Sequence, residues 1–445
     1  MVASNVSLPV ATIDKLAFGG SGVCRIDDKV CFVPYSCPGD TVSLQVVSEK
    51  KSYSSADIVQ VLTPSPFRTT PPCPRFGVCG GCNWQHVHYD VQLEQKRQIF
   101  ADTLWRGARV AVELISALLP APQQYGYRSR VQFKTTVRQG KFQIGFYRQG
   151  SHAVIDLIDG CPLTVPTINA VLARCRSLLS IFSDAQAITQ VSVDVGEQEV
   201  VVVIQYAGSH HRQLSSFLRE HAQDFFPCTG IYLQTGERKS PAKVWGSERI
   251  SYSLPSHTTD GEPLLLSYEP GSFSQINRSQ NSVMLSVIRR LGGFLPTEKL
   301  LDLYCGNGNF TIPLAAEVAS VIGIEGSEAS IRSARFNCDA NNVKNTEFIC
   351  RDVQSGLRQL VADGRMFDTI LLDPPRAGAA DCIRSIAALN PDKIVYVSCN
   401  PGTLGRDCAL LSDSGYRVIE SVPLDMFPQT YHLESVTLLY QTVKG

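Results

Sequence analysis

The sequence predicts a multidomain fold: a small N-terminal β-barrel, a central α+β domain and a C-terminal α/β domain. Three patterns support this prediction. Residues 1–66 alternate apolar and polar residues in short runs, residues 67–265 mix helical with strand-like runs, and residues 266–445 alternate strands with helices. Alternation of the last kind is typical of a doubly wound sheet that binds ligands at the carboxyl ends of its strands. The 445 residues, of which 44% are hydrophobic, can form two or three cores.

The first of these domains is predicted from its turns. Gly19-Gly20, Asp27-Asp28 and Pro38-Gly39 interrupt its strand-like runs, and a linker, Thr63-Pro64-Ser65-Pro66, ends it. The stretch from Gly22 to Pro34 resembles the TRAM domain, an OB-like RNA-binding module attached to several RNA-modifying enzymes. The resemblance implies an OB-like barrel that binds RNA, whereas the composition alone fits any five-stranded barrel.

The central domain, residues 67–265, is predicted to contain a helix from about Tyr89 to Leu104 and strands at Val191–Val195 and Val200–Ile204. The segment from Tyr125 to Lys134 interleaves aromatic and cationic side chains, which suits either RNA or a solvated hairpin face. The overall charge does not favour RNA, because 41 basic and 41 acidic residues cancel. RNA binding would therefore depend on local patches.

A group of cysteines in the central domain has the spacing of a metal site. Cys73, Cys79 and Cys82 follow the pattern Cys-x5-Cys-x2-Cys, and Cys161 lies further along the chain, before a proline. Gly-rich turns allow several thiolates to converge on one centre. Four cysteine ligands suit both an iron–sulfur cluster and a zinc ion, and ligand chemistry alone leaves the two open.

A strand, a glycine-containing turn and a helix start are predicted over Lys299–Phe310. Gly306 and Gly308 let the backbone turn tightly and approach a ligand. Glu325 ends the next strand-like run, where its carboxylate could accept hydrogen bonds from two ribose hydroxyls. The third glycine that seats a pyrophosphate is missing, because Phe310-Thr311 fills that stretch. Its absence favours S-adenosylmethionine, which carries ribose and adenine but no phosphate.

Cys399 is predicted to be a nucleophile. It follows the apolar run Ile394–Ser398, so a buried strand would deliver it to the sheet edge, and the helix start beyond it is expected to lower its pKa. An inert buried cysteine is the alternative for this segment in isolation. Asp373 ends another strand-like run, and the two prolines after it hold its carboxylate in one orientation. Arg376 stands where enzymes that methylate a base amine tend to place an aromatic residue, which disfavours that reaction.

The chain resembles the RNA 5-methyluridine methyltransferase family, specifically its iron–sulfur branch, which modifies uracil in 23S ribosomal RNA. The matching motifs are Asp302–Phe310, Asp373–Gly378, Ser398–Pro401 and His432–Val436, in the family's order. The resemblance implies that the C-terminal domain, residues 266–445, is a class I, Rossmann-like methyltransferase domain that uses S-adenosylmethionine.

The same resemblance implies roles for single residues. Cys399 would be the nucleophile and Glu434 the general base. The implied contacts to S-adenosylmethionine come from Gln275, Tyr304, Asn309, Glu325, Asp352 and Asp373. The implied ligands of a 4Fe-4S cluster, which would make the central domain an iron–sulfur domain, are Cys73, Cys79, Cys82 and Cys161.

The chemistry explains why a thiol and a base are needed. Uracil carbon-5 is too weak a nucleophile to accept a methyl cation unaided, but addition of the Cys399 thiolate to carbon-6 directs charge onto carbon-5. After methylation, a base such as Glu434 removes the carbon-5 proton and the thiolate leaves. His432 is a rival base and Asp373 a more distant one. Cytosine is disfavoured, because Pro-Cys dipeptides, which carry a second catalytic cysteine in cytosine enzymes, lie far from the cofactor loop.

We therefore predict methylation of carbon-5 of a specific uridine in 23S ribosomal RNA. One alternative is the same reaction on transfer RNA, against which the TRAM-like module and the cysteine group argue; the other is a non-catalytic RNA-binding protein. The odd number of cysteines, 15, and the lack of a leader at Met1–Asn5 predict a reducing, cytoplasmic location. No stretch is apolar enough to span a bilayer, and the family resemblance suggests a monomer.

Overall fold

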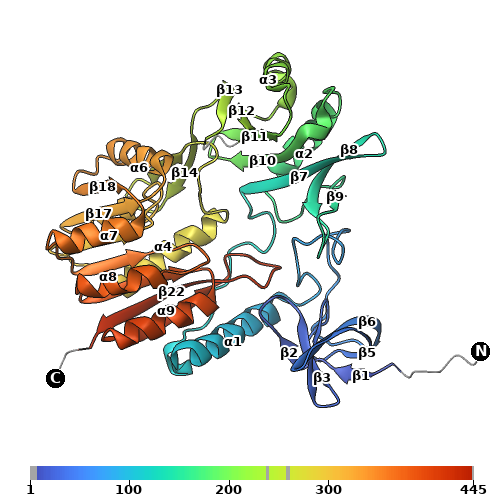
Figure 1. The fold of residues 1–445 in the computed structure, drawn as a ribbon, viewed down its shortest axis with the longest axis horizontal. Helices are drawn as coiled ribbons and strands as arrows, with labels where there is room; N and C mark the ends of the chain where they lie inside the picture. Colours follow the sequence, from blue (N-terminus) through green and yellow to red (C-terminus); the bar gives the residue numbers. More distant parts are fainter. Residues whose placement is uncertain (1–7, 237–239, 257–260, 443–445) are drawn as a thin grey trace, which may run out of the picture.

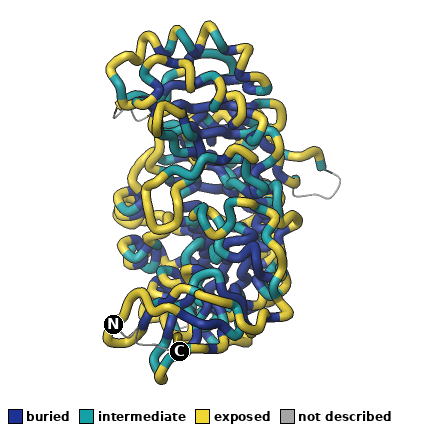
Figure 2. The backbone as a smooth tube through the Cα atoms, turned by 90° about the vertical axis from the view of Figure 1, so that its right-hand side faces the viewer, coloured by how far each residue is buried: buried dark blue, intermediate teal, exposed yellow. Residues whose placement is uncertain are grey.

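The computed structural model describes residues 8–236, 240–256 and 261–442, and the strands in these ranges form four sheets (Figure 1). Met1–Asn5, where the sequence predicts that a leader is absent, lies outside the described residues. Buried residues lie in the interior and exposed residues surround them (Figure 2). No helix in the described ranges combines the length and the apolarity that a membrane crossing requires.

The N-terminal sheet has six strands and curls back on itself. Its strands are β1 (Val10–Thr12), β2 (Lys15–Leu16), β3 (Gly22–Ile26), β4 (Lys29–Val33), β5 (Thr41–Glu49) and β6 (Tyr53–Thr63). The sheet order is β1-β5-β6-β4-β3-β2, yet β1 also lies against β3. Asp27 and Asp28 both have positive φ and form the tight turn between β3 and β4. This confirms the predicted interruption of the strand-like run at these two residues.

The central sheet has seven strands in the order β13-β12-β11-β10-β7-β8-β9. Its strands are β7 (Arg130–Arg138), β8 (Lys141–Tyr147), β9 (Val154–Asp156), β10 (Ile188–Val195), β11 (Val200–Tyr206), β12 (Gly230–Thr235) and β13 (Ala242–Gly246). The helices α2 (Pro166–Leu179) and α3 (His211–Glu220) pack on it through Val171 and Leu214. The strands predicted at Val191–Val195 and Val200–Ile204 are confirmed as parts of β10 and β11.

The first helix, α1 (Tyr89–Ala108), confirms the prediction of a helix from about Tyr89. It packs against α9 (Pro401–Asp413) rather than against the central sheet (Figure 1). The approach is close because two glycines meet: a Cβ on Gly107 would lie 2.9 Å from the Cα of Gly405. On its other side α1 contacts β2, where Gln95 Oε1 accepts a hydrogen bond of 2.7 Å from the Leu16 N–H.

A separate two-stranded sheet, β14 (Ile250–Leu254) with β15 (Leu264–Tyr268), lies between the central and C-terminal sheets along the chain. The boundary that the sequence places after residue 265 therefore falls inside β15. Tyr252 and Tyr268 of this sheet belong to the same buried cluster as Met284 and Leu285 of α4 (Arg278–Gly292), the helix that precedes the C-terminal sheet.

The C-terminal sheet is doubly wound, as predicted, in the order β18-β17-β16-β19-β20-β22-β21. Its strands are β16 (Lys299–Leu303), β17 (Ser320–Glu325), β18 (Thr346–Cys350), β19 (Thr369–Leu372), β20 (Lys393–Ser398), β21 (Tyr416–Leu424) and β22 (Glu434–Gln441). One face is covered by α4, α5 (Thr311–Ala315) and α6 (Glu328–Ala340). The other face is covered by α7 (Val353–Ala362), α8 (Ile383–Ala388), α9 and the distant α1. Short 3₁₀ helices cover Val112–Leu114, Ala185–Ala187, Ala222–Phe225 and Ala380–Cys382.

Candidate active site

The predicted cofactor and catalytic residues lie along one edge of the C-terminal sheet. The carboxyl ends of five parallel strands meet there, and β22 begins there because it runs antiparallel to β20. The strand order changes direction between β16 and β19, which is where doubly wound sheets bind their ligands. In order across this edge, the strand ends carry Asp352, Glu325, Tyr304, Asp373, Cys399 and Glu434.

The turn after β16 has the backbone that the sequence predicted for a ligand cradle. Tyr304, Gly306 and Gly308 all have positive φ, of 62°, 56° and 85°. A Cβ on Gly308 would lie 2.7 Å from the side chain of Ile312, so a larger residue does not fit there. Positive φ is costly for a tyrosine, and such strained residues cluster at ligand sites.

Local hydrogen bonds hold three more of the predicted cofactor residues. Asn309 exchanges hydrogen bonds of 2.8 and 3.0 Å with Asn281. Glu325 Oε1 accepts a hydrogen bond of 2.7 Å from the Ser327 N–H, and Asp352 caps the start of α7. These contacts fix the strand ends and the turn around which a nucleoside could bind.

Gln275 lies away from the strand ends, in the segment between β15 and α4. Residues 269–272 of this segment line a surface cavity of about 560 Å³ together with residues 326–329, which follow β17. The carbonyl of Ile276 accepts a hydrogen bond of 2.9 Å from the Ser129 N–H, next to the central sheet. The segment of Gln275 therefore joins the cofactor edge to the central sheet.

Strand register brings the predicted nucleophile and base together. Ser398 of β20 pairs with Ser435 of β22, and Cys399 and Glu434 are the next residues toward the edge. The Ser435 hydroxyl donates a hydrogen bond of 3.2 Å to the Ser398 carbonyl. Asn400 then caps α9, so the chain turns away directly after the thiol. Cys399 is partly exposed, whereas Glu434 is buried.

The expectation that the helix start lowers the pKa of Cys399 is wrong. Burial, together with the negative charges of Glu434 and Asp373, raises the pKa of the Cys399 thiol to about 11. The Arg376 guanidinium acts in the opposite direction but does not outweigh them. The resting site therefore holds a protonated thiol, and the proton has to leave when the nucleophile attacks.

The pKa values of the neighbouring carboxyl groups, Asp373 and Glu434, are also raised. Burial raises the pKa of Asp373 to about 7. Burial and the Asp373 charge raise the pKa of Glu434 well above its ordinary value, and Arg376 opposes this. Burial, helped by cations that include Arg376, lowers the pKa of His432 to about 4, so this ring is neutral near pH 7. Strongly perturbed carboxyl groups beside a thiol are typical of a catalytic site.

Four cysteines, the three of the Cys-x5-Cys-x2-Cys pattern and the distant Cys161, line a single cavity in the central part of the molecule. Its lining also includes the side chains of Arg75, Gln85 and Arg128. Each of these three has a buried nitrogen, Nε, Nε2 and Nε respectively, without a hydrogen-bond partner in residues 8–236, 240–256 and 261–442. No group of three or more His, Cys, Asp or Glu side chains among the described residues is arranged to hold a metal ion. The thiols that surround the cavity are Cys73, Cys79, Cys82 and Cys161.

A groove with about 640 Å³ of space extends from the surroundings of this cavity to Arg376 and the segment before Glu434. Arg128 and Phe146 line both the cavity and the groove. At its other end the groove is lined by Arg376, Tyr431 and His432. Cations and aromatic rings thus lie along a path from the cysteines to the sheet edge. No role of Arg376 in the site is predicted from the sequence, because its charge acts on Cys399 only in the folded chain.

A doubly wound sheet with a nucleoside cradle and a thiol at one edge defines a class: the S-adenosylmethionine-dependent methyltransferases. Comparison with protein families places the chain within this class. The model described as tRNA (Uracil-5-)-methyltransferase matches residues 88–442, and the TRAM domain model of tRNA (uracil(54)-C(5))-methyltransferase matches residues 10–67. The chain belongs to the RNA uracil-5 methyltransferase family, and its N-terminal β-sheet is a TRAM domain.

Curated relatives match over nearly the full length. The 23S rRNA (uracil(1939)-C(5))-methyltransferase RlmD of Dechloromonas aromatica is 34% identical, with 97% of this chain and 99% of the relative covered. The protein of the same name from Cronobacter sakazakii is 35% identical, with 96% and 95% covered. The crystal structure of Pyrococcus abyssi tRNA (uracil-54, C5)-methyltransferase in complex with S-adenosyl-L-homocysteine matches with a TM-score of 0.72 and 29% identity, covering 97% of this chain and 100% of that one.

The TRAM match limits what the TRAM-like module says about the substrate. The TRAM-like module was expected to speak against a transfer RNA substrate. The TRAM model that matches here is itself described for a transfer RNA enzyme, and it covers residues 10–67. A TRAM domain therefore does not separate the two kinds of substrate.

Proposed function

We propose that this enzyme transfers a methyl group from S-adenosylmethionine to carbon-5 of a uridine in 23S ribosomal RNA. The observation that carries the proposal is the register of β20 and β22, because it sets a thiol beside a buried carboxyl group at the cofactor edge. Full-length relatives that are named for this reaction on 23S rRNA support the choice of substrate.

We propose Cys399 as the nucleophile and Glu434 as the base. The Cys399 thiolate adds to carbon-6 of uracil, which makes carbon-5 nucleophilic. Bound S-adenosylmethionine supplies the methyl group. Glu434 in its ionised form then takes the carbon-5 proton, and the bond from the Cys399 sulfur to carbon-6 breaks to release the product. Because Cys399 starts as a thiol, its proton has to pass to a neighbouring base on attack, and we propose Asp373, whose charge acts on the thiol and whose pKa is raised by burial to about 7.

His432 is a weaker candidate for the base. Its low pKa makes it a poor proton acceptor near pH 7, because burial and then the nearby cations disfavour the protonated ring. We propose that residues at the sheet edge and in the segment before α4 contact S-adenosylmethionine. They are Gln275, Tyr304, Asn309, Glu325, Asp352 and Asp373.

The four cysteines are proposed to hold a 4Fe-4S cluster. Such a cluster with four thiolates is anionic and carries sulfide acceptors, so it needs several thiols around a space and N–H donors directed to it. The cavity supplies both, since Arg75, Gln85 and Arg128 present buried nitrogens without partners. These donors suit the anionic sulfur atoms of either an iron–sulfur cluster or a zinc site, and the resemblance to the iron–sulfur branch of the family favours the cluster. The methylation steps require no electron transfer.

The RNA is proposed to lie in the groove that Arg128, Phe146 and Arg376 line, where cations can meet phosphates and rings can stack on bases. Transfer RNA is the second candidate substrate, favoured by the match to the Pyrococcus abyssi enzyme. A non-catalytic role has no support, because the chain belongs to an enzyme family and has both proposed catalytic residues.

We propose domains at residues 1–66, 67–265 and 266–445, the last of them the methyltransferase domain. The separate N-terminal sheet supports the first domain, and the separate C-terminal sheet, which starts at β16, supports the last, although the boundary after residue 265 divides β15. A cytoplasmic monomer is proposed as well. All 15 cysteines are free thiols, which suits a reducing compartment.

The experiment that tests the function is an assay under anaerobic conditions with a labelled methyl donor. Ribosomal and transfer RNA lacking the modification are supplied separately, and nucleosides are identified by mass spectrometry. We expect 5-methyluridine in 23S RNA. Label in transfer RNA alone would replace the substrate and keep the reaction, whereas methylated cytidine in either RNA would overturn the reaction.

A further inference from the structure

The loop that precedes the proposed base is held by buried contacts from a helix more than 300 residues earlier in the chain. This loop, residues 425–433, joins β21 to β22 and ends directly at Glu434. It contains no helix or strand, yet Asp425, Gln429 and Thr430 are each almost fully buried. A buried irregular loop needs partners for its polar groups. Helix α1 supplies several of them, and Leu119, Tyr127 and Asn277 supply others.

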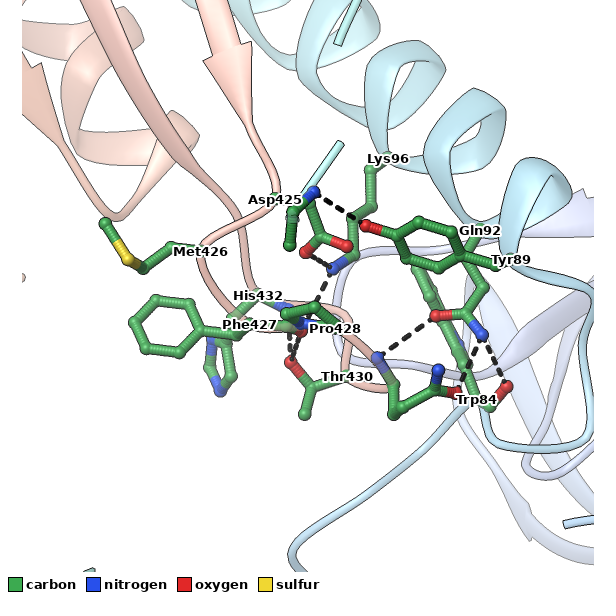
Figure 3. A network of polar contacts seen from close by, with 12 residues as sticks. Trp84, Tyr89, Gln92, Lys96, Asp425, Met426, Phe427, Pro428, Thr430 and His432 are labelled. Carbon is green, nitrogen blue, oxygen red and sulfur yellow. Dashed lines mark hydrogen bonds and ion pairs between the residues drawn. The ribbon is translucent and has the colours of Figure 1, made fainter. Parts of the chain in front are cut away.

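Lys96 of α1 anchors the start of the loop. Its Nζ lies 2.5 Å from Asp425 Oδ1 and donates a second hydrogen bond, of 3.1 Å, to the carbonyl of Phe427 (Figure 3). Neither side chain of the ion pair has any exposed surface. A buried, hydrogen-bonded ion pair holds its two elements in one arrangement, because separation would leave a charge without a partner.

Gln92, one helical turn earlier, clamps the middle of the loop. Its Oε1 accepts a hydrogen bond of 3.1 Å from the Gln429 N–H, and its Nε2 donates one of 2.9 Å to Gln429 Oε1 (Figure 3). Gln429 has a φ of 69°, a backbone conformation that is strained for a residue other than glycine. The clamp therefore stabilises a turn that the loop would not favour by itself.

The same turn is joined to the cysteine segment. The carbonyl of Gln429 accepts hydrogen bonds of 3.1 Å from the N–H groups of both Asn83 and Trp84, the two residues after Cys82. Gln92 also donates to the Trp84 carbonyl, at 3.0 Å. The segment that leaves the cysteine cavity, α1 and the loop before Glu434 are thus one hydrogen-bonded unit.

We propose that Gln92 and Lys96 are positioning residues for the removal of the carbon-5 proton: they hold the loop 425–433 so that the Glu434 carboxylate reaches carbon-5 of the covalent adduct. The inference rests on the proposed function. Cys399 follows β20, which α1 does not hold in this way, so thiolate addition and methyl transfer do not depend on the clamp. Losing the clamp then delays the last chemical step and leaves the earlier ones unchanged.

The test separates proton removal from methyl transfer in a single turnover. The RNA carries tritium at carbon-5 of its uridines, and S-adenosylmethionine carries a carbon-14 methyl group. Tritium released to water reports proton removal, and carbon-14 in a denaturation-resistant protein–RNA complex reports the methylated adduct. The variants are Gln92→Ala and, to avoid an unpaired buried charge, the double variant Lys96→Met with Asp425→Asn. Gln98→Ala, an exposed glutamine on the same helix, is the matched control.

For Gln92→Ala, at saturating RNA, we expect tritium release to slow by about tenfold or more, because a displaced base loses its reach, with methyl transfer little changed. The KM for RNA is expected to rise, because Tyr431 and His432 of the same loop line the groove. The methylated adduct then accumulates. Equal slowing of both labels without an adduct, or release as fast as in Gln98→Ala, would overturn the inference. The double variant is expected to accumulate the same adduct, and its failure to do so while it remains folded would count against Lys96. If wild type and Gln98→Ala release no tritium at all, the proposed function itself fails.

Discussion

Ser398 and Ser435 are paired across β20 and β22, and the hydroxyl of Ser435 donates a hydrogen bond of 3.2 Å to the carbonyl of Ser398. This pair determines the geometry of the candidate site, because the next residues toward the sheet edge are Cys399 and Glu434. A slip of one residue in this register would turn Glu434 to the other face of the sheet. The chemistry therefore depends on the pairing of two strands that are distant in sequence.

Replacement of the nucleophile should stop the reaction and spare the cofactor site. For Cys399→Ala we expect turnover to fall by roughly a thousandfold or more, because carbon-5 is no longer activated. The strand ends around Tyr304 and Glu325 are untouched, so the affinity for S-adenosylmethionine should stay within a factor of two. Isothermal titration and methyl incorporation measure the two quantities. Persistent methylation would refute the covalent mechanism.

Replacement of the base should trap an intermediate. Glu434→Gln keeps the shape of the side chain but cannot accept the carbon-5 proton. We expect a methylated protein–RNA complex that survives denaturation and appears on a gel, with multiple turnover lost. His432→Gln serves as the comparison. If the complex forms in His432→Gln but not in Glu434→Gln, the histidine is the base.

The thiol should become reactive only at high pH. With the pKa of Cys399 at about 11, alkylation by iodoacetamide should rise about tenfold per pH unit from pH 7 to pH 10. Glu434→Gln should shift this profile to lower pH because it removes a nearby negative charge, and Arg376→Gln should shift it to higher pH. Mass spectrometry of the peptide that contains Cys399 gives the rate. A plateau near pH 7 in the wild type would contradict the protonated resting thiol.

The cysteine cavity should bind iron through all four thiols. For Cys161→Ser, purified without oxygen, we expect the visible absorbance of an iron–sulfur cluster and the bound iron to drop sharply. Cys350→Ser, an exposed cysteine away from the cavity, is the control and should keep both. Elemental analysis distinguishes the metals. Zinc in place of iron in the anaerobic wild-type protein would refute the proposed cluster.

A buried carboxyl group beside the cofactor turn should make stability depend on pH. Burial raises the pKa of Asp302 to about 7, so the folded state keeps a proton that the unfolded state loses. The stabilising contribution is complete below about pH 4 and is lost as the pH rises through 7. As the pH rises from 4 to 8, the free energy of unfolding of Asp302→Asn should therefore increase relative to that of the wild type by up to roughly 4 kcal/mol.

Denaturant unfolding at several pH values measures this difference. Asp413→Asn, at an exposed aspartate that ends α9, is the control and should follow the wild type. Parallel curves for Asp302→Asn and wild type would show that Asp302 is already ionised in the folded protein at low pH.

The sequence by itself determined the features that depend on local chemistry. Gly306 and Gly308 predicted the turn after β16, and the apolar run Ile394–Ser398 predicted that Cys399 would emerge from a buried strand. Alternating strands and helices after residue 266 predicted the doubly wound sheet. Local backbone preference and hydrophobic pattern carry this information, because each acts over a few neighbouring residues.

Only the tertiary structure decided how distant groups act on one another. The pKa of Cys399 was expected to be low from the helix start, but it is raised by burial and by two carboxyl groups from other strands. The helix α1 was expected in the central domain, yet it packs on α9 and clamps the loop before Glu434. Charge interactions and buried hydrogen bonds depend on distance in space, and distance in space follows from how the sheets and helices pack.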